Sequence, residues 1–188
     1  NPEISVMDIT YPIPTLSADT FNLFYPQASG CVAKDAGKKG LNYKYGYPYH
    51  HACMQYFAVY NKNGGVYIGL EDPTASSKIF TVTAGENKAN FNLEFCAPNG
   101  TKPKNAFKIP GVLRFCEFSG DWFEASEIYS AFVKEKCDWL PKLGANGRKD
   151  LPERFRKIPF WVADFIPNTP YQRENKPMNL SAGSDIYS

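Results

Sequence analysis

The 188-residue chain lacks a long uninterrupted hydrophobic run. No apolar stretch approaches the ~20 residues that a transmembrane helix needs, so we expect no membrane partner. Neither sign of charge dominates, because 21 basic residues face 19 acidic ones and the formal net charge is +2. Proteins that bind nucleic acid usually carry a concentrated basic field, so we expect no nucleic-acid partner.

Histidine and cysteine are too few, or wrongly spaced, to predict a metal site. His50 and His51 are the only histidines, and adjacent residues of a strand point to opposite faces. The five cysteines form no C-x-x-C pair and no zinc-ligand spacing. We therefore predict no metal and no cofactor. Mostly reduced, buried thiols are the favoured state, with one disulfide as the alternative.

Aromatic residues and turn formers are abundant instead. The chain has 12 Tyr, 14 Phe and 3 Trp, together with 14 Gly and 15 Pro. This composition favours a strand-rich fold with many turns. Alternation and turn signals predict strands at 4–9, 21–25, 54–61, 66–71, 78–83, 90–96 and 111–118. Residues 33–49 are predicted to form a long loop, and 61–65 a hairpin turn in which glycine supplies a positive φ.

The spacing of apolar residues changes after the strands, from the period of a strand to that of a helix. Residues 121–136 are predicted to form an amphipathic helix, with Asp121 as its N-cap and Glu124 completing a capping box. The apolar stripe expected to be buried comprises Trp122, Ala125, Ile128, Tyr129, Phe132 and Val133. Successive strands at short spacing predict an antiparallel meander in a β-sandwich. The fold class is therefore mainly β, with this helix after the strands.

The rest of the chain suggests a connector and the start of another domain. Residues 141–157 are polar, and 158–162 form a short apolar run that resembles a buried strand. A lone buried strand has no partner, and the sheets would have unpaired edges. We expect three parts: a sandwich segment over 1–140, a connector over 141–157, and the first strand and loop of a truncated barrel over 158–188. The chain would then be a fragment of a longer, processed or excised protein.

Three segments resemble one bacterial family. The hairpin Met54-Gln-Tyr-Phe-Ala-Val-Tyr-Asn61, followed by Gly64-Gly-Val-Tyr-Ile-Gly-Leu-Glu-Asp-Pro73, is similar to a hairpin of a glycoside-hydrolase-like family that carries a domain of unknown function. The run Gly120-Asp-Trp-Phe-Glu-Ala-Ser-Glu-Ile-Tyr129 resembles a helix of the same family. The stretch from Trp139 to Val162 resembles its approach to a catalytic (β/α)₈ barrel. The resemblance implies a galactose-mutarotase-like β-supersandwich followed by that barrel.

The resemblance also implies that the whole protein acts in carbohydrate metabolism. Glycoside hydrolysis uses two carboxylates, which barrel enzymes place at the C-terminal ends of strands. Only the first barrel strand would be present here, so we expect the catalytic carboxylates outside this chain and assign no catalytic residue within it.

Four residues are candidates for substrate contact. Trp161 and Asp164 would lie at the rim of the first barrel strand, where an aromatic ring and a carboxylate suit a sugar. Tyr45 and Tyr47 belong to an alternating row of tyrosines at 43, 45, 47 and 49, whose side chains share one face of an extended segment. The row is either a platform on which sugars stack or a face packed against another domain. Structural roles are the alternative for all four residues.

These observations lead to one functional hypothesis and two rivals. The chain is predicted to be the non-catalytic β-sandwich portion of a secreted glycoside hydrolase, extracellular or periplasmic, with a glycan and its own catalytic barrel as partners. A stand-alone carbohydrate-binding module is the first rival. A structural or adhesion sandwich is the second.

Overall fold

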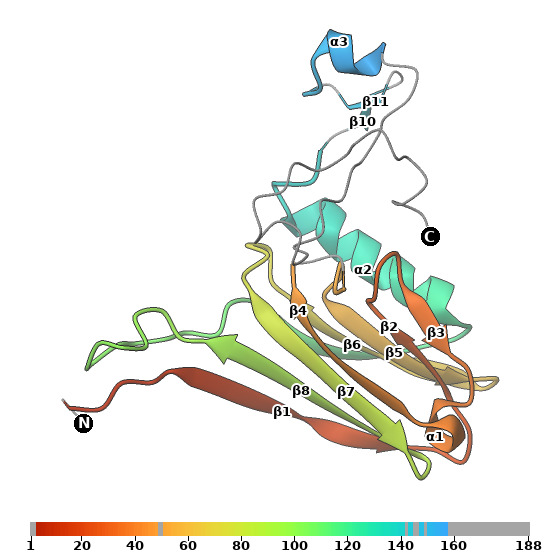
Figure 1. Cartoon of the computed structure of the whole chain (residues 1–188). Coiled ribbons are helices and arrows are strands. Elements are labelled where there is room, and N and C mark those ends of the chain that lie inside the picture. The colour runs from red at the N-terminus through yellow and green to blue at the C-terminus, as the bar shows by residue number, and fades with distance from the viewer. Residues whose placement is uncertain (1–2, 49–50, 142, 145–146, 149, 158–188) are drawn as a thin grey trace, which may run out of the picture. The chain divides into compact units, whose positions relative to one another are not determined.

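The computed structural model describes residues 3–48, 51–141, 143–144, 147–148 and 150–157. The chain divides into two compact units, 1–140 and 141–188. The first unit is mainly β and contains two antiparallel sheets, as the sequence predicts (Figure 1). The predicted barrel strand at 158–162 and its following loop lie outside the described residues.

The four-stranded sheet has the order β1-β8-β7-β4. All neighbouring strands are antiparallel, and β7 and β8 form a hairpin in which Gly85 pairs with Lys88. The strands are β1 (Asp8–Ser17), β8 (Lys88–Cys96), β7 (Lys78–Gly85) and β4 (Leu41–Tyr47).

The five-stranded sheet has the order β3-β2-β5-β6-β9, again antiparallel throughout. A single turn of helix, α1 (Ala36–Lys39), connects this sheet to β4 of the other. The strands are β3 (Cys31–Ala33), β2 (Asn22–Tyr25), β5 (Tyr56–Asn61), β6 (Gly64–Glu71) and β9 (Val112–Phe118).

Three expectations about the strands are wrong. The strand predicted at 4–9 instead runs over Asp8–Ser17, because this segment is the one that pairs with β8. The predicted loop over 33–49 contains α1 and the whole of β4, because alternating tyrosines suit an extended strand despite the glycines around them. The strands also do not follow one another as a simple meander. After the β5–β6 hairpin the chain crosses to the other sheet for β7 and β8, and it then returns to place β9 beside β6.

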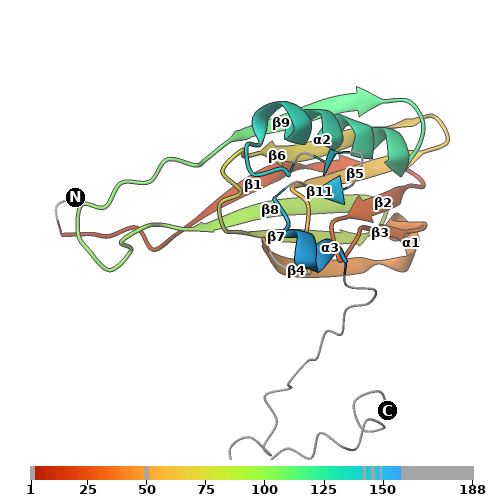
Figure 2. The ribbon, with the colours of Figure 1, turned by 90° about the horizontal axis from the view of Figure 1, so that it is seen from above.

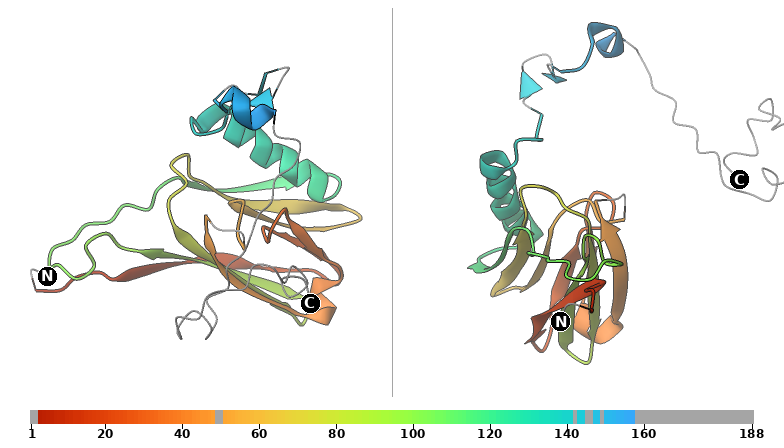
Figure 3. Two further views of the ribbon diagram at one scale, coloured as in Figure 1. Left: turned by 45° about the horizontal axis from the view of Figure 1, so that its top comes forward. Right: turned by 90° about the vertical axis from the view of Figure 1, so that its left-hand side faces the viewer.

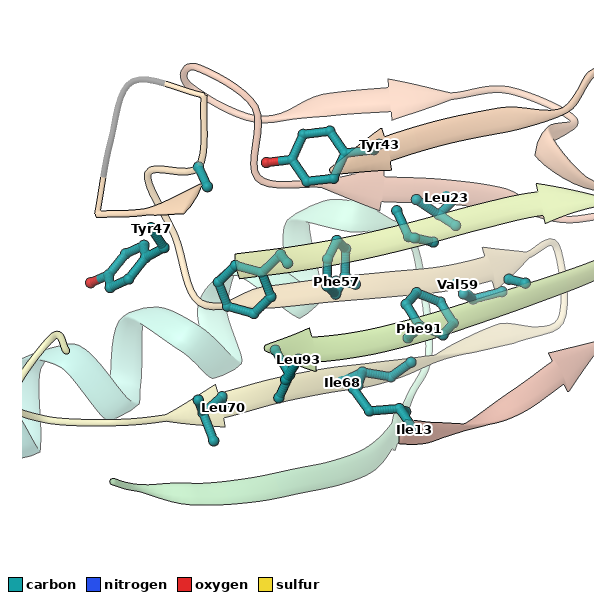
Figure 4. Packing of buried hydrophobic residues seen from close by; sticks show 14 of the residues in the cluster. Ile13, Leu23, Tyr43, Tyr47, Phe57, Val59, Ile68, Leu70, Phe91 and Leu93 are labelled. Atoms are coloured by element: carbon teal, nitrogen blue, oxygen red, sulfur yellow. The ribbon is translucent and has the colours of Figure 1, made fainter. Parts of the chain in front are cut away.

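The main core lies between the two sheets, where alternate residues of each strand point inward. Phe91 and Leu93 of β8 face the layer that carries Phe57 of β5 and Ile68 of β6 (Figure 4). Aromatic rings meet at its centre, since Phe57 lies 5.4 Å from Phe80 and 5.3 Å from Phe91 between ring centroids. The abundant aromatic residues, which indicated a strand-rich fold in the sequence, thus fill much of the core between the two sheets.

The β5–β6 hairpin matches the turn predicted at 61–65. Asn61 pairs with Gly64, and the Asn61 side chain accepts a hydrogen bond from the Asn63 amide at 2.9 Å. The positive φ is at Gly64, with a value of 128°, while Lys62 and Asn63 keep negative φ angles. Placing glycine after a two-residue turn is one of the standard ways to close a hairpin.

Helix α2 (Trp122–Lys136) covers the outer face of the five-stranded sheet, on the side away from the other sheet (Figures 2 and 3). Both bonds of the predicted capping box are present: the Asp121 side chain accepts from the Phe123 and Glu124 amides, and the Glu124 carboxylate accepts from the Asp121 amide. The helix packs into a second core on β5 and β6.

Part of the predicted apolar stripe on α2 is exposed. Ala125, Tyr129, Phe132 and Val133 are buried, as predicted. Trp122, however, leaves 42% of its surface open to solvent. It belongs to the first turn of the helix and stacks on Phe24 of β2 through one face of its indole, so helical periodicity alone overstated its burial.

All five cysteines are free thiols, as expected. Only Cys137 is buried, however, so the expectation of buried thiols is wrong for the other four, of which Cys53 and Cys96 are exposed. Within the described part of the chain, no helix combines the length and the hydropathy that crossing a membrane requires.

The described residues of the second unit form short elements. β10 (Leu143–Gly144) pairs with β11 (Gly147–Arg148), and α3 (Glu153–Arg156) follows. The Arg148 guanidinium donates to the Asp150 carboxylate next to the hairpin.

Candidate functional site

The tyrosine row lies on β4, the edge strand of the four-stranded sheet, and faces the other sheet. Tyr43, Tyr45 and Tyr47 share one face, as alternation predicts. Tyr43 and Tyr47 are buried, with 2% and 5% of their surface exposed, whereas Tyr45 is 39% exposed. The described tyrosines therefore do not form a continuous exposed platform. Tyr49 lies outside the described residues.

The ring of Tyr45 contacts two neighbouring rings at this edge. It stacks on His51 with 4.5 Å between ring centroids and an interplanar angle of 28°. It also meets Tyr43, in a tilted arrangement, at 5.1 Å and 56°. An aromatic ring that already packs on its neighbours loses little rotamer freedom when a ligand binds, because most of that freedom is already lost.

Tyr43 links the edge strand to the segment that carries His51. Its hydroxyl donates a hydrogen bond to the His51 carbonyl oxygen. Burial raises the pKa of Tyr43 well above its ordinary value, and the nearby Cys53 thiol adds to the effect. The hydroxyl therefore remains protonated, and it keeps this donor role over the accessible pH range.

A buried polar cluster contacts the ring of Tyr47. The Lys78 ammonium donates to the Asp72 carboxylate at 2.9 Å and to the Gln55 side-chain oxygen at 2.5 Å. Gln55 in turn donates to the Asp72 backbone carbonyl at 3.0 Å. The same ammonium lies 4.7 Å from the centre of the Tyr47 ring, within the range of a cation–π contact.

The two charged groups of this cluster respond differently to burial. Burial raises the pKa of Asp72, but hydrogen bonds from Thr74 and Lys78 and the Lys78 charge outweigh it and hold the pKa at about 2. Burial lowers the pKa of Lys78, and the Asp72 carboxylate opposes that shift. At neutral pH we infer an ionised pair, because two strong hydrogen bonds satisfy the ammonium.

Asp72 also closes a turn after β6. Its carboxylate accepts from the Thr74 amide at 2.9 Å, from the Thr74 hydroxyl at 2.6 Å and from the Ser76 amide at 2.8 Å. With Lys78 added, this carboxylate has four hydrogen-bond donors. A buried carboxylate so fully bonded organises structure, and it is poorly placed to exchange protons with a substrate.

The other two predicted contacts, Trp161 and Asp164, lie outside the described residues, as does His50. Among the residues that are described, no cluster of three or more His, Cys, Asp or Glu side chains is arranged to hold a metal ion.

Sequence reasoning missed the buried cluster, although one signal was available. Lys78 alternates in phase with Phe80 and Val82, which are core positions of β7. A lysine in the inward phase of a strand must find acceptors, because an unpaired buried ammonium is costly. The pattern could therefore have predicted a buried acid near the start of β7.

Comparison with protein-family models, with curated proteins and with solved structures gives no match to this chain. The proposals that follow rest on the residues themselves and on the resemblance described above.

Proposed function

We propose that the chain is the non-catalytic β-sandwich portion of a secreted bacterial glycoside hydrolase, and that Tyr45 contacts the glycan. The observation that carries the sugar contact is the Tyr45 ring, which is 39% exposed at a sheet edge and packs on His51 and Tyr43. The family assignment is supported by the resemblance of the β5–β6 hairpin and of the α2 segment, and by the mainly β fold.

The chemistry of a sugar suits such a ring. The axial C–H groups of a pyranose form an apolar patch that packs on an aromatic face, while the tyrosine hydroxyl exchanges hydrogen bonds with sugar hydroxyls or water. A ring already held in place binds without a large ordering penalty. Tyr47 is assigned a supporting role in this proposal, because its ring is buried above Lys78.

The proposal leaves catalysis to the rest of the protein. The catalytic carboxylates would belong to a barrel domain encoded beyond this segment, and Trp161 and Asp164 stay candidates for substrate contact at its first strand. If the chain as given hydrolysed aryl glycosides at enzyme-like rates, its non-catalytic assignment would be overturned.

Calorimetric titration with a panel of soluble glycans tests the sugar contact. We expect Tyr45→Ala to lose binding and Tyr45→Phe to keep most of it, because the ring supplies the contact. Tyr11→Ala is the matched control, since Tyr11 is a comparably exposed tyrosine on β1, at the opposite edge of the same sheet. Binding that is unchanged in Tyr45→Ala, or no binding to any glycan, would contradict the proposal.

A stand-alone carbohydrate-binding module is the second candidate, and the same exposed ring favours it. The two functions differ in what the gene encodes after this segment. A barrel domain there supports the hydrolase, whereas a gene without one, combined with glycan binding that depends on Tyr45, supports the module. A structural or adhesion sandwich predicts neither glycan binding nor a barrel.

A further inference from the structure

A hollow lies on the five-stranded sheet, beside the start of α2. It has a volume of about 820 Å³ and is lined by side chains from β2, from the β5–β6 turn and from the first turn of the helix. Its contact groups include Asn22, Lys34, Asn61, Lys62, Trp122 and Phe123. None of these residues belongs to the Tyr45 edge, so the hollow is a separate surface feature.

The indole of Trp122 is supported by a stack of buried rings. It lies parallel to the Phe24 ring, with 6.3 Å between centroids and 10° between planes. Phe24 stacks in turn on Tyr56 at 5.0 Å and 12°, and Tyr56 on Tyr67 at 5.2 Å and 20°. Stacking on Phe24 uses one face of the indole, and the exposed part of the side chain remains for contact.

Phe123 adds a second exposed ring next to Trp122. The two rings meet edge to face, 6.1 Å apart and at 82°, and 55% of Phe123 is open to solvent. Two large aromatic residues side by side on the surface are unusual unless they contact something, because exposing them forgoes the free energy of burial. Because the two rings are nearly perpendicular, one ring could stack on the face of a ligand while the other contacts its edge.

The other lining groups are polar and balanced in charge. Lys34 and Lys62 bring two positive charges, and Asp121 and Glu124 bring two negative ones. The two carboxylates are fixed in place by the capping box. Since the four formal charges cancel, the lining favours an uncharged ligand, and the amides and ammonium groups offer hydrogen bonds to hydroxyls.

We propose that this hollow binds a neutral saccharide, which stacks on Trp122 and hydrogen-bonds to the polar lining. The choice of a saccharide rests on the function proposed above, whereas the hollow, its aromatic support and its charge balance are independent of Tyr45. The site is largely preformed, because buried rings hold Trp122 before any ligand arrives. It would give the protein a second contact with a glycan chain, on the opposite sheet.

The indole N–H resonance of Trp122 tests the proposal at the site itself. In the chain labelled with ¹⁵N-tryptophan, Trp122→Phe identifies this resonance by its disappearance. We expect neutral gluco-, xylo- or galacto-oligosaccharides to shift it in a saturable titration. Trp122→Ala should weaken binding at this site about tenfold or more, the equivalent of one good aromatic contact. Trp122→Phe should retain most of the affinity, measured by calorimetry.

Two controls separate this site from general effects. Trp139 is also exposed, and its indole N–H donates to the Pro73 carbonyl, so Trp139→Phe should leave saccharide binding unchanged. Oligogalacturonate serves as the charged probe. A preference for it over every neutral saccharide would overturn the assignment to a neutral ligand, and weaker binding supports the assignment.

The two sugar proposals fail in different ways. If Tyr45→Ala abolishes glycan binding while the Trp122 resonance never moves, the second site does not exist and the function stands. If the Trp122 resonance shifts and Tyr45→Ala changes nothing, the hollow is a site and the Tyr45 contact is wrong. If no saccharide moves the resonance and none binds by calorimetry, both proposals are overturned.

Discussion

The Lys78 ammonium and the Asp72 carboxylate form an ion pair 2.9 Å long in which neither side chain has any solvent exposure. The Gln55 side chain accepts from the same ammonium and donates to the Asp72 backbone carbonyl, so the pair belongs to a cluster that joins the residue before β5, the residue after β6 and the start of β7. Buried pairs of this kind add little net stability compared with apolar residues, but losing one partner leaves a charge without compensation.

Removing the lysine should therefore destabilise the protein strongly. We expect Lys78→Met to lower the free energy of unfolding by about 3–5 kcal/mol, because Asp72 keeps its charge or must bind a proton in a buried position. Urea denaturation measures the change. Lys44→Met is the matched control: its pair with Glu94 is 3.1 Å long but largely exposed, so a change within about 1 kcal/mol is expected. Equal losses in the two variants would contradict this account.

Acid should weaken the fold through Asp72. The pKa of this carboxyl falls from its ordinary value of 3.8 to about 2 in the folded chain. A carboxyl with a depressed folded pKa stabilises the protein above its unfolded pKa, and this contribution disappears as the pH falls through the folded pKa. The expected loss is about 2 kcal/mol between about pH 4 and pH 2.

The comparison variant for this pH effect is Asp72→Asn, which has no carboxyl to titrate. Its stability at neutral pH should be lower, and its stability between about pH 4 and pH 2 should depend less on pH than that of the parent chain. Denaturation curves recorded at several acidic pH values give the change of the unfolding free energy with pH for each chain. If this change were the same in both chains, other carboxylates would control the acid sensitivity.

Replacing a large side chain by alanine should cost different amounts of stability at the two ends of α2. Phe132 is 6% exposed in the second core, so Phe132→Ala should reduce stability by about 3–5 kcal/mol. Trp122 is 42% exposed, so Trp122→Ala should lose only about 1–2 kcal/mol, in proportion to the smaller apolar area removed from water. Thermal or urea unfolding of both variants checks the order. A larger loss at Trp122 would mean that the indole is more deeply packed than the structure indicates.

Sequence patterns predicted local features best where one interaction decides the structure. The capping box depends on Asp121 and Glu124 alone, and the hairpin depends on a glycine after a short turn, so both were visible in the chain. The two-sheet character followed from composition and turn spacing. The crossings between the sheets were missed, because strand order depends on packing between residues distant in sequence.

The candidate site was predicted less well, for a physical reason. Alternation correctly put Tyr43, Tyr45 and Tyr47 on one face of β4, but it could not say which of them the opposite sheet covers. That depends on how the opposite sheet packs against β4, which is a tertiary property. The same limit explains Trp122, whose helical phase is right, while only one face of its indole is covered, by Phe24 of β2.

The glycine that ends the β5–β6 turn should be hard to replace. Gly64 has φ of 128°, and a Cβ added there would lie 2.8 Å from the Phe118 carbonyl oxygen of the neighbouring strand β9. Gly64→Ala should therefore reduce stability by about 1–3 kcal/mol, through backbone strain and a contact that only a shift of β6 or β9 relieves. Gly85 ends β7, and a Cβ there would meet nothing within 4 Å. Gly85→Ala should therefore stay within about 1 kcal/mol of the parent chain. If the two alanine variants unfolded at the same urea concentration, the hairpin would adapt to a side chain, and the left-handed position would not be what closes the turn.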